Sequence, residues 1–262
     1  MAKLWRLWLG SAKLELSDEL SYRFNFTLKT IMNFFTNFFT PIFTLLVYTI
    51  SSGLPGWSFE EFLLMNGIFI LVSGLGGTFF QSMTWRTLDD IWRGRYDQHL
   101  IRPVNPLTYA TLKTFNPDGL PAVTVGLLIA SYALIKLHWI FSVDNLLAFI
   151  ALVGLALLFL YALCVITIAM AFLFTKSWVL INAFEDILGI GKNPLSIYGS
   201  AGTFLFTFVF PVGIAAFYPA QALLGRLSLP MIGELALVAF AFFGFSLLMW
   251  NFGIKKYTSA GG

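Results

Sequence analysis

Long apolar runs alternate with short polar stretches along most of this sequence. The runs lie near residues 24–50, 62–82, 119–137, 146–174, 196–217 and 231–252. An apolar run of about 20 residues is long enough for a helix to cross the hydrocarbon core of a membrane. The pattern therefore predicts an all-α, polytopic membrane protein with six transmembrane helices in one domain over residues 1–262. An even number of spans places both chain ends on the same side.

The composition agrees with this prediction and excludes a water-soluble globular domain. Of the 262 residues, 58% are hydrophobic and 11% are charged, whereas a soluble domain has about 25% charged residues. The single cysteine, Cys164, excludes a disulfide within the chain and a cysteine-based metal site. His99 and His138 fall in different predicted loops, so we expect no metal ion. We also expect no nucleic-acid partner.

Positive charges predict the orientation of the spans. If both ends face the cytoplasm, every Lys and Arg except Lys136 and Arg226 lies on the cytoplasmic side, Lys192 included. Cytoplasmic connections are enriched in Lys and Arg. We therefore expect both termini in the cytoplasm.

The segment 1–23 has a pattern of its own. Its apolar residues recur near helical spacing, which predicts a helix that lies along the inner membrane face in contact with lipid. The helix either acts as a lever or only anchors the first span. Because it has no uninterrupted apolar core, we expect no cleavable signal peptide. The apolar positions are Trp5, Trp8, Leu9, Ala12, Leu16 and Leu20.

The connection 83–118 carries more charge than any other. Around Trp85–Arg93 the apolar residues share one helical face and the charges occupy the others. Gly94 is expected to end this helix, and Pro103 to end the short turn after it. Such a loop either docks a soluble partner or is a solvated hairpin with salt bridges.

The chain lacks the groups that would power transport. No Asp or Glu lies in the middle of a predicted span, whereas ion-coupled carriers keep such carboxylates for use. The Gly191-Lys192 pair is followed by Asn193 and lacks the earlier glycine of a phosphate-binding loop. No catalytic set is recognisable, so we expect no enzyme. The adjacent acids Glu60-Glu61, Asp89-Asp90 and Glu185-Asp186 are interpreted as solvated surface pairs.

Three stretches carry a resemblance to a known family. They are Gly94–Pro106, the run from Phe210-Pro211 through Tyr218-Pro219-Ala220 to Gly225, and the tail Lys256–Gly262. Together they resemble the membrane subunit, or permease, of type-2 ABC exporters, in the subgroup of small six-span permeases. The resemblance covers the whole chain and implies export, in a bacterial inner membrane.

The resemblance also implies partners. Two permeases, identical or sister subunits, would stand above two cytoplasmic ATPase subunits, and ATP and Mg²⁺ would bind there, with no cofactor in this chain. The first cytoplasmic loop, 83–118, would hold the coupling helix. The stretch 209–226 would be re-entrant on the outer side, and a simple kink and loop is the alternative. The coupling residues would be Arg86, Asp89, Asp90, Arg93, Gly94, Arg95, Asp97, Arg102 and Pro103.

The transport path would lie between the two permeases, along the second and fifth spans. The second span is rich in small and polar residues, which serve either a polar lining or close helix packing. The first span would pass an amphipathic cargo or face lipid. A channel or membrane scaffold that binds a soluble protein without transport is the alternative function. The path candidates are Asn33, Asn37, Asn66, Ser73, Gln81, Phe210 and Tyr218.

Overall fold

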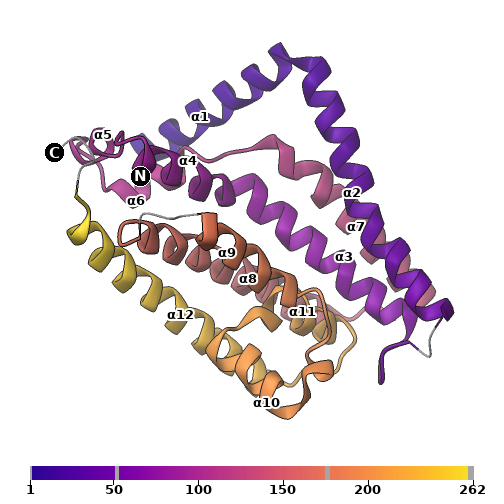
Figure 1. The fold of residues 1–262 in the computed structure, drawn as a ribbon. Coiled ribbons are helices and arrows are strands. Elements are labelled where there is room, and N and C mark those ends of the chain that lie inside the picture. The colour runs from indigo at the N-terminus through magenta and orange to yellow at the C-terminus, as the bar shows by residue number, and fades with distance from the viewer. Residues whose placement is uncertain (1, 51–52, 175–177, 259–262) are drawn as a thin grey trace.

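The protein is helical throughout the part that the structure describes. The computed structural model describes residues 2–50, 53–174 and 178–258, and these ranges contain no strand (Figure 1). The all-α class is confirmed. The long helices are α1 (Ala2–Ser21), α2 (Arg23–Ile50), α3 (Phe59–Gly76), α4 (Ser82–Trp92), α7 (Leu120–Lys136), α8 (Val143–Ala171), α9 (Trp178–Ile190) and α12 (Leu229–Lys256). The short ones are η1 (Gly77–Gln81), α5 (Asp97–Leu100), α6 (Pro106–Leu112), η2 (Pro117–Gly119), η3 (Leu195–Tyr198), α10 (Gly199–Phe204), η4 (Leu205–Val209), η5 (Val212–Ala215) and α11 (Phe217–Leu223).

Five helical stretches in the described residues are long and apolar enough to cross a membrane. They correspond to the first, second, third, fourth and sixth predicted spans. In the second, α3, η1 and α4 follow one another without a break. The stretches are Arg23–Ile50, Phe59–Trp92, Pro117–Lys136, Val143–Ala171 and Leu229–Lys256.

The predicted fifth span, 196–217, is helical only as far as Val209, and the helix breaks within the stretch 209–226, for which a re-entrant segment or a kink and loop is expected. Its helical part, Leu195–Val209, is shorter than 18 residues. At a rise of about 1.5 Å per residue, such a helix is too short to cross a hydrocarbon core about 30 Å thick. The helix ends where Phe210 leaves the helical conformation before Pro211, and short turns follow in η5 and α11.

The segment before it, α9, packs against α8 and faces the second span across a cavity. One cavity is lined by Ser73 and Trp85 from the second span together with Phe184 and Leu188 from α9. Just after α9, the Lys192 ammonium lies 5.6 Å from the centre of the Phe69 ring. Residues 178–192 therefore lie beside the second span and do not form only a polar connection, and the side of the membrane on which Lys192 lies stays a prediction.

Two sets of contacts mark the two ends of the bundle. At one end Arg226 forms an ion pair with Glu61, and the Trp139 indole donates to the Leu223 carbonyl at 2.6 Å. At the other end lie α4, α5 and α6, and both chain ends lie near them (Figure 1). Glu61 also closes the N-terminal capping box of α3 with Ser58. The interpretation of Glu61 as a solvated acid is therefore wrong.

The centre of the bundle is the contact between α3 and α7. A Cβ added to Gly126 would lie 2.4 Å from the Leu71 nitrogen, and one added to Gly67 would lie 2.7 Å from the Ala130 nitrogen. Because the glycines have no side chain, the two backbones approach closely, as small residues allow between membrane helices. The small residues of the second span thus serve packing within one chain.

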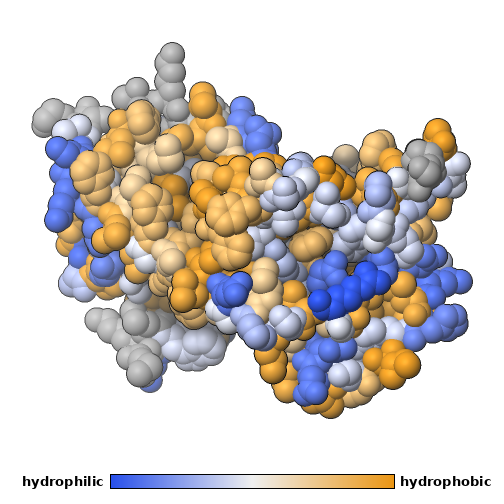
Figure 2. Space-filling view, turned by 90° about the horizontal axis from the view of Figure 1, so that it is seen from below, coloured by the Kyte–Doolittle hydropathy of each residue, from blue (hydrophilic) through white to orange (hydrophobic). Residues whose placement is uncertain are grey.

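The outer helices leave apolar side chains exposed. Few residues of α2 and α12 are buried within the chain, and exposed phenylalanines include Phe39 and Phe43 on α2. Figure 2 shows hydrophobic side chains over much of the left and central part of one face, with hydrophilic ones along the left edge and across the right part. Such a surface suits contact with lipid or with another membrane subunit.

The N-terminal helix α1 stands at a sharp angle to α2 (Figure 1). Glu15 on α1 accepts from Arg86 on α4 at 2.6 Å, and Glu19 accepts from Lys29 on α2 at 3.1 Å. Trp5 remains exposed. Its position on the membrane surface stays a prediction, but α1 is tied to both its neighbours by ion pairs.

Candidate functional site

The charged loop is built from a helix end that the sequence specifies. Trp92 is the last residue of α4, and Gly94 follows with φ 65°, the left-handed conformation that glycine adopts at little cost. The Arg95 N–H then donates to the Asp90 carbonyl at 2.8 Å. The chain is thus turned back beside α4, as expected from Gly94.

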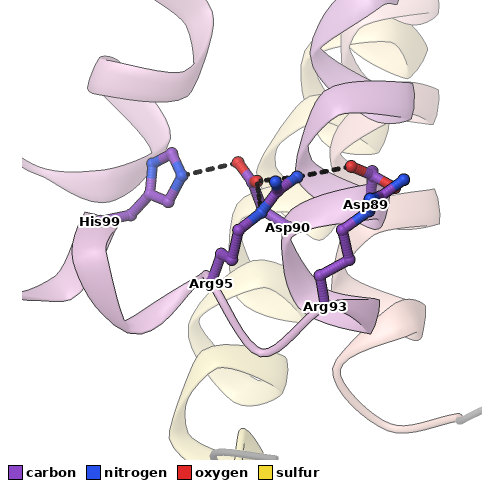
Figure 3. Close-up of polar contacts among 5 residues, drawn as sticks. All are labelled: Asp89, Asp90, Arg93, Arg95 and His99. Atoms are coloured by element: carbon purple, nitrogen blue, oxygen red, sulfur yellow. Dashed lines mark hydrogen bonds and ion pairs between the residues drawn. The ribbon is translucent and has the colours of Figure 1, made fainter.

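Ion pairs hold this turn in place. Arg95 contacts Asp89 at 2.6 Å and Asp90 at 3.1 Å, and Arg93 contacts Asp89 at 2.7 Å. Figure 3 shows Arg95 between the two carboxylates, with His99 on the other side of Asp90 at 2.9 Å. Asp89 and Asp90, interpreted as a solvated surface pair, are partly exposed and are joined by Arg95, as in a solvated hairpin with salt bridges. The pairs are partly exposed, so each contributes at most about 1 kcal/mol to stability.

An aromatic cluster lies beneath the turn. The Tyr96 ring is 1% exposed and packs 4.9 Å from Phe172 and 5.4 Å from Tyr257. Burial raises the pKa of Tyr96 above its ordinary value, and Tyr257 adds to the rise. Burial and then the nearby Asp97 raise the pKa of Tyr257. Both rings therefore stay neutral at physiological pH. They join the loop to the C-terminal end of α12.

The tip of the loop is apolar and exposed. The Ile101 side chain is 83% exposed and Leu100 is 41% exposed. Directly after them, the Arg102 guanidinium lies 4.5 Å from the centre of the Tyr109 ring, a cation–π contact. Pro103 follows the turn. An exposed aliphatic pair on a turn held by ion pairs is suited to insertion into a groove on another protein.

The predicted coupling residues fall into separate groups. Arg86 lies at the base of the loop, where it pairs with α1 and donates to the Lys113 carbonyl at 3.0 Å. Asp97 lies beside Tyr257, and Arg102 lies beside Tyr109. The structure brings only Asp89, Asp90, Arg93 and Arg95 together, around the turn at Gly94.

Two of the predicted path residues line one cavity. Ser73 and Gln81 from the second span face a cavity of about 310 Å³, closed on its other side by Phe184 to Lys192 of α9 and the turn after it. Glu185 is part of this lining. The cavity has both charged and apolar walls.

Asn66 lines a second, larger cavity of about 540 Å³ between α2 and α3. Phe39, Phe43 and Phe62 supply most of its apolar wall, and Lys192 closes one side. The Asn66 amide donates to the Phe62 carbonyl at 2.9 Å within its own helix. Its carbonyl oxygen is thus left for other contacts in this cavity.

The remaining path candidates lie elsewhere. Asn33 donates to the Asp118 carbonyl at 3.3 Å, and Asn37 donates to the Asn33 carbonyl at 2.7 Å, so both belong to the seam beside η2. Tyr218 is buried in α11 with its hydroxyl 2.6 Å from that of Thr207. Phe210 is exposed where the helix breaks. None of these four lines either cavity.

Sequence reasoning missed Lys192, Glu185, Tyr96 and Tyr257. Lys192 and Glu185 were missed because the acids and the Gly191-Lys192 pair of this stretch are typical of a polar connection. The apolar residues of α9 around them were the signal that could have predicted a helix there. The tyrosines meet only through contacts distant in sequence. In the described residues, no group of three or more His, Cys, Asp or Glu side chains could hold a metal ion.

Comparison with known proteins gives one match. A family model described as ABC-2 family transporter protein matches residues 31–261. No curated protein and no solved structure matches the chain. The matched range contains both cavities and the charged loop, and leaves α1 outside.

Proposed function

This chain belongs to the ABC-2 family of transporter proteins, and from that premise we propose that it is the permease subunit of an exporter driven by separate ATPase subunits. Family membership confirms the resemblance seen in the sequence. A permease of this family is a membrane component of an ABC transporter. We place ATP and Mg²⁺ on the cytoplasmic ATPase partners, and the cargo path between this permease and a second one, identical or a sister subunit.

The exposed apolar tip of the charged loop carries the proposal of ATPase coupling. Leu100 and Ile101 stand out from a turn that Arg95 ties to α4 through Asp89 and Asp90. A partner that binds this tip would therefore move α4 together with the loop. Because α4 continues through η1 into α3, the same motion reaches the wall of both cavities.

Coupling also requires that the loop contacts the two states of the ATPase differently, since a partner that binds both states equally shifts nothing. Closure of the ATPase dimer on ATP would bring two docked loops together. The two permeases would then change their relative tilt, and the path between them would open outward.

Replacement of the tip residue tests this assignment. Ile101→Asp is expected to remove the ATPase from the purified complex, since a buried apolar contact is replaced by a charge that must lose water. Co-purification of the two proteins from cells that express the permease with its cognate ATPase is the measurement. The matched control is Ile140→Asp, because Ile140 is similarly exposed, at 85%, in the connection at the opposite end of the bundle.

The control variant is expected to retain the ATPase. An Ile101→Asp variant that holds its ATPase as firmly as the native chain would overturn the docking assignment. Transport by vesicles that contain the permease alone would overturn the proposed function itself.

A further inference from the structure

Lys192 lies beside the interior of the second span, away from both of its ends. Its ammonium is 5.6 Å from the centre of the Phe69 ring. Phe69 follows the first residue of α3, Phe59, by ten positions, a rise of about 15 Å along the helix. That distance is about half of a hydrocarbon core about 30 Å thick. A charge at this depth is costly and is kept for a use.

The charge of Lys192 is not neutralised within the described chain. None of the carboxylates that the structure describes lies within 4.0 Å of its ammonium, although other Lys and Arg side chains of the described residues form seven such contacts. Glu185 precedes it on α9, which ends at Ile190, and forms no ion pair with it. The Phe69 ring offers only a cation–π contact, which is weaker than an ion pair.

The two cavities meet at this side chain. Lys192 lines both the cavity of about 310 Å³ beside Ser73 and Gln81 and the cavity of about 540 Å³ beside Asn66, and no other lining residue is shared. The first cavity extends toward Trp85 at the cytoplasmic end of the second span. The second extends toward Leu54 at the opposite end. A cargo that passes from one to the other therefore passes Lys192.

We propose that the cargo is an anionic amphiphile, whose acidic group pairs with Lys192 midway while its apolar body occupies the phenylalanine-lined cavity. This inference rests on the proposed function and names its substrate class. An anionic group at Lys192 would neutralise the ammonium in a medium of low dielectric, where the attraction is far stronger than in water. Phe39, Phe43 and Phe62 fit an acyl or aromatic body.

The charged lining of the smaller cavity adds to this picture. Glu185 lies on α9, before Lys192 in the chain, and also lines this cavity, where it would repel an anionic head group and attract a cationic one. The anionic group of the cargo is therefore more stable beside Lys192 than beside Glu185. A cationic amphiphile would instead be held at Glu185 and repelled at Lys192.

The test is direct binding of two probes that differ only in head-group charge. Dodecyl phosphate and dodecyltrimethylammonium are titrated calorimetrically into the permease in phosphatidylcholine nanodiscs, with empty nanodiscs subtracted. Native permease is expected to bind dodecyl phosphate at least about tenfold more tightly, the equivalent of about 1.4 kcal/mol. Lys192→Gln is expected to lose this preference, and Lys192→Arg to keep it.

Lys136→Gln is the matched control. The Lys136 ammonium also lies over an aromatic ring, 5.8 Å from the centre of Tyr132, but lines neither cavity. This variant is expected to bind as the native chain does. Equal binding by native permease and Lys192→Gln, preference for the cationic probe, or no binding above that of empty nanodiscs would each overturn the cargo class.

If Lys192→Gln fails to fold, the test is still decisive. The preference for dodecyl phosphate over the cationic probe is also measured on the native permease and on Lys192→Arg. No ATPase is needed for binding. A negative result therefore removes the anionic cargo and leaves the permease assignment, which the Ile101 experiment tests separately.

Discussion

Arg95 holds two neighbouring carboxylates at once, so its side chain decides how firmly the loop is attached to α4. Its guanidinium contacts Asp89 and Asp90, whereas Arg93 contacts Asp89 alone. A contact with two acids fixes the direction of the turn after Gly94. Because the contacts are partly exposed, they contribute little to the free energy of unfolding. Their main effect is to hold the loop tip in a fixed position.

Arg95→Gln is expected to lower the stimulation of the partner ATPase by this permease several-fold, because the loop tip loses its fixed position. The melting temperature of the permease is expected to change little, since exposed ion pairs contribute about 0–1 kcal/mol each. The measurement is ATP hydrolysis by the reconstituted complex, beside a thermal unfolding curve. Arg93→Gln is the control and is expected to retain most of the stimulation. Equal losses in both variants would contradict the role given to Arg95.

At the scale of elements, helices and turns that depend only on neighbouring residues could be predicted from the sequence. Gly94 ends α4 as expected, and five apolar runs form helices, although the second continues to Trp92, beyond the predicted end at residue 82. The fifth span could not be placed in this way. The apolar run continues past Val209, but Pro211 cannot continue a helix, and the helix α9 carries Glu185 and Asp186, which resemble a loop in sequence.

The candidate site was predicted in the same uneven manner. Composition and motif placed the charged loop, but not the partners within it, because Tyr96 meets Phe172 and Tyr257 only after α8 and α12 have packed. Lys192 was assigned to a cytoplasmic connection by a counting rule. Its contact with Phe69 depends on where the packing of α9 on α8 places the turn after α9, which no local pattern specifies.

The pairing of α3 with α7 is the element contact most sensitive to substitution. Gly126→Leu is expected to destabilise the permease by more than about 3 kcal/mol or to prevent folding, since overpacking alone costs about 1–3 kcal/mol and here the obstacle is the backbone of Leu71. Thermal unfolding of the detergent-solubilised protein measures the change. Gly154→Leu on α8 is the control, because nothing lies within 4 Å of a Cβ added there. A Gly126→Leu variant as stable as the control would contradict the close approach of the helices.

At the scale of the whole molecule, the two ends of the bundle have different characters. One end is closed by the Glu61–Arg226 pair and the Trp139–Leu223 hydrogen bond. The other end carries the charged loop and both termini (Figure 1). The distribution of Lys and Arg predicts that the loop end faces the cytoplasm.

Cysteine labelling tests this orientation. Lys136→Cys is expected to react with a membrane-impermeant maleimide added to intact spheroplasts, and Gln98→Cys only after the membrane is opened. Both side chains are exposed. The native Cys164 is fully buried, so the background is low. Labelling of Gln98→Cys in intact spheroplasts would place the charged loop outside and contradict its role in ATPase docking.

The contact between Tyr257 and Tyr96 makes the docking surface depend on the last helix. Tyr257 directly follows α12, which packs along α8, so the aromatic floor under the loop is complete only when α12 lies in its place. A permease whose α12 was displaced would therefore present an incomplete docking surface. The ATPase would then bind only a bundle whose helices are all packed.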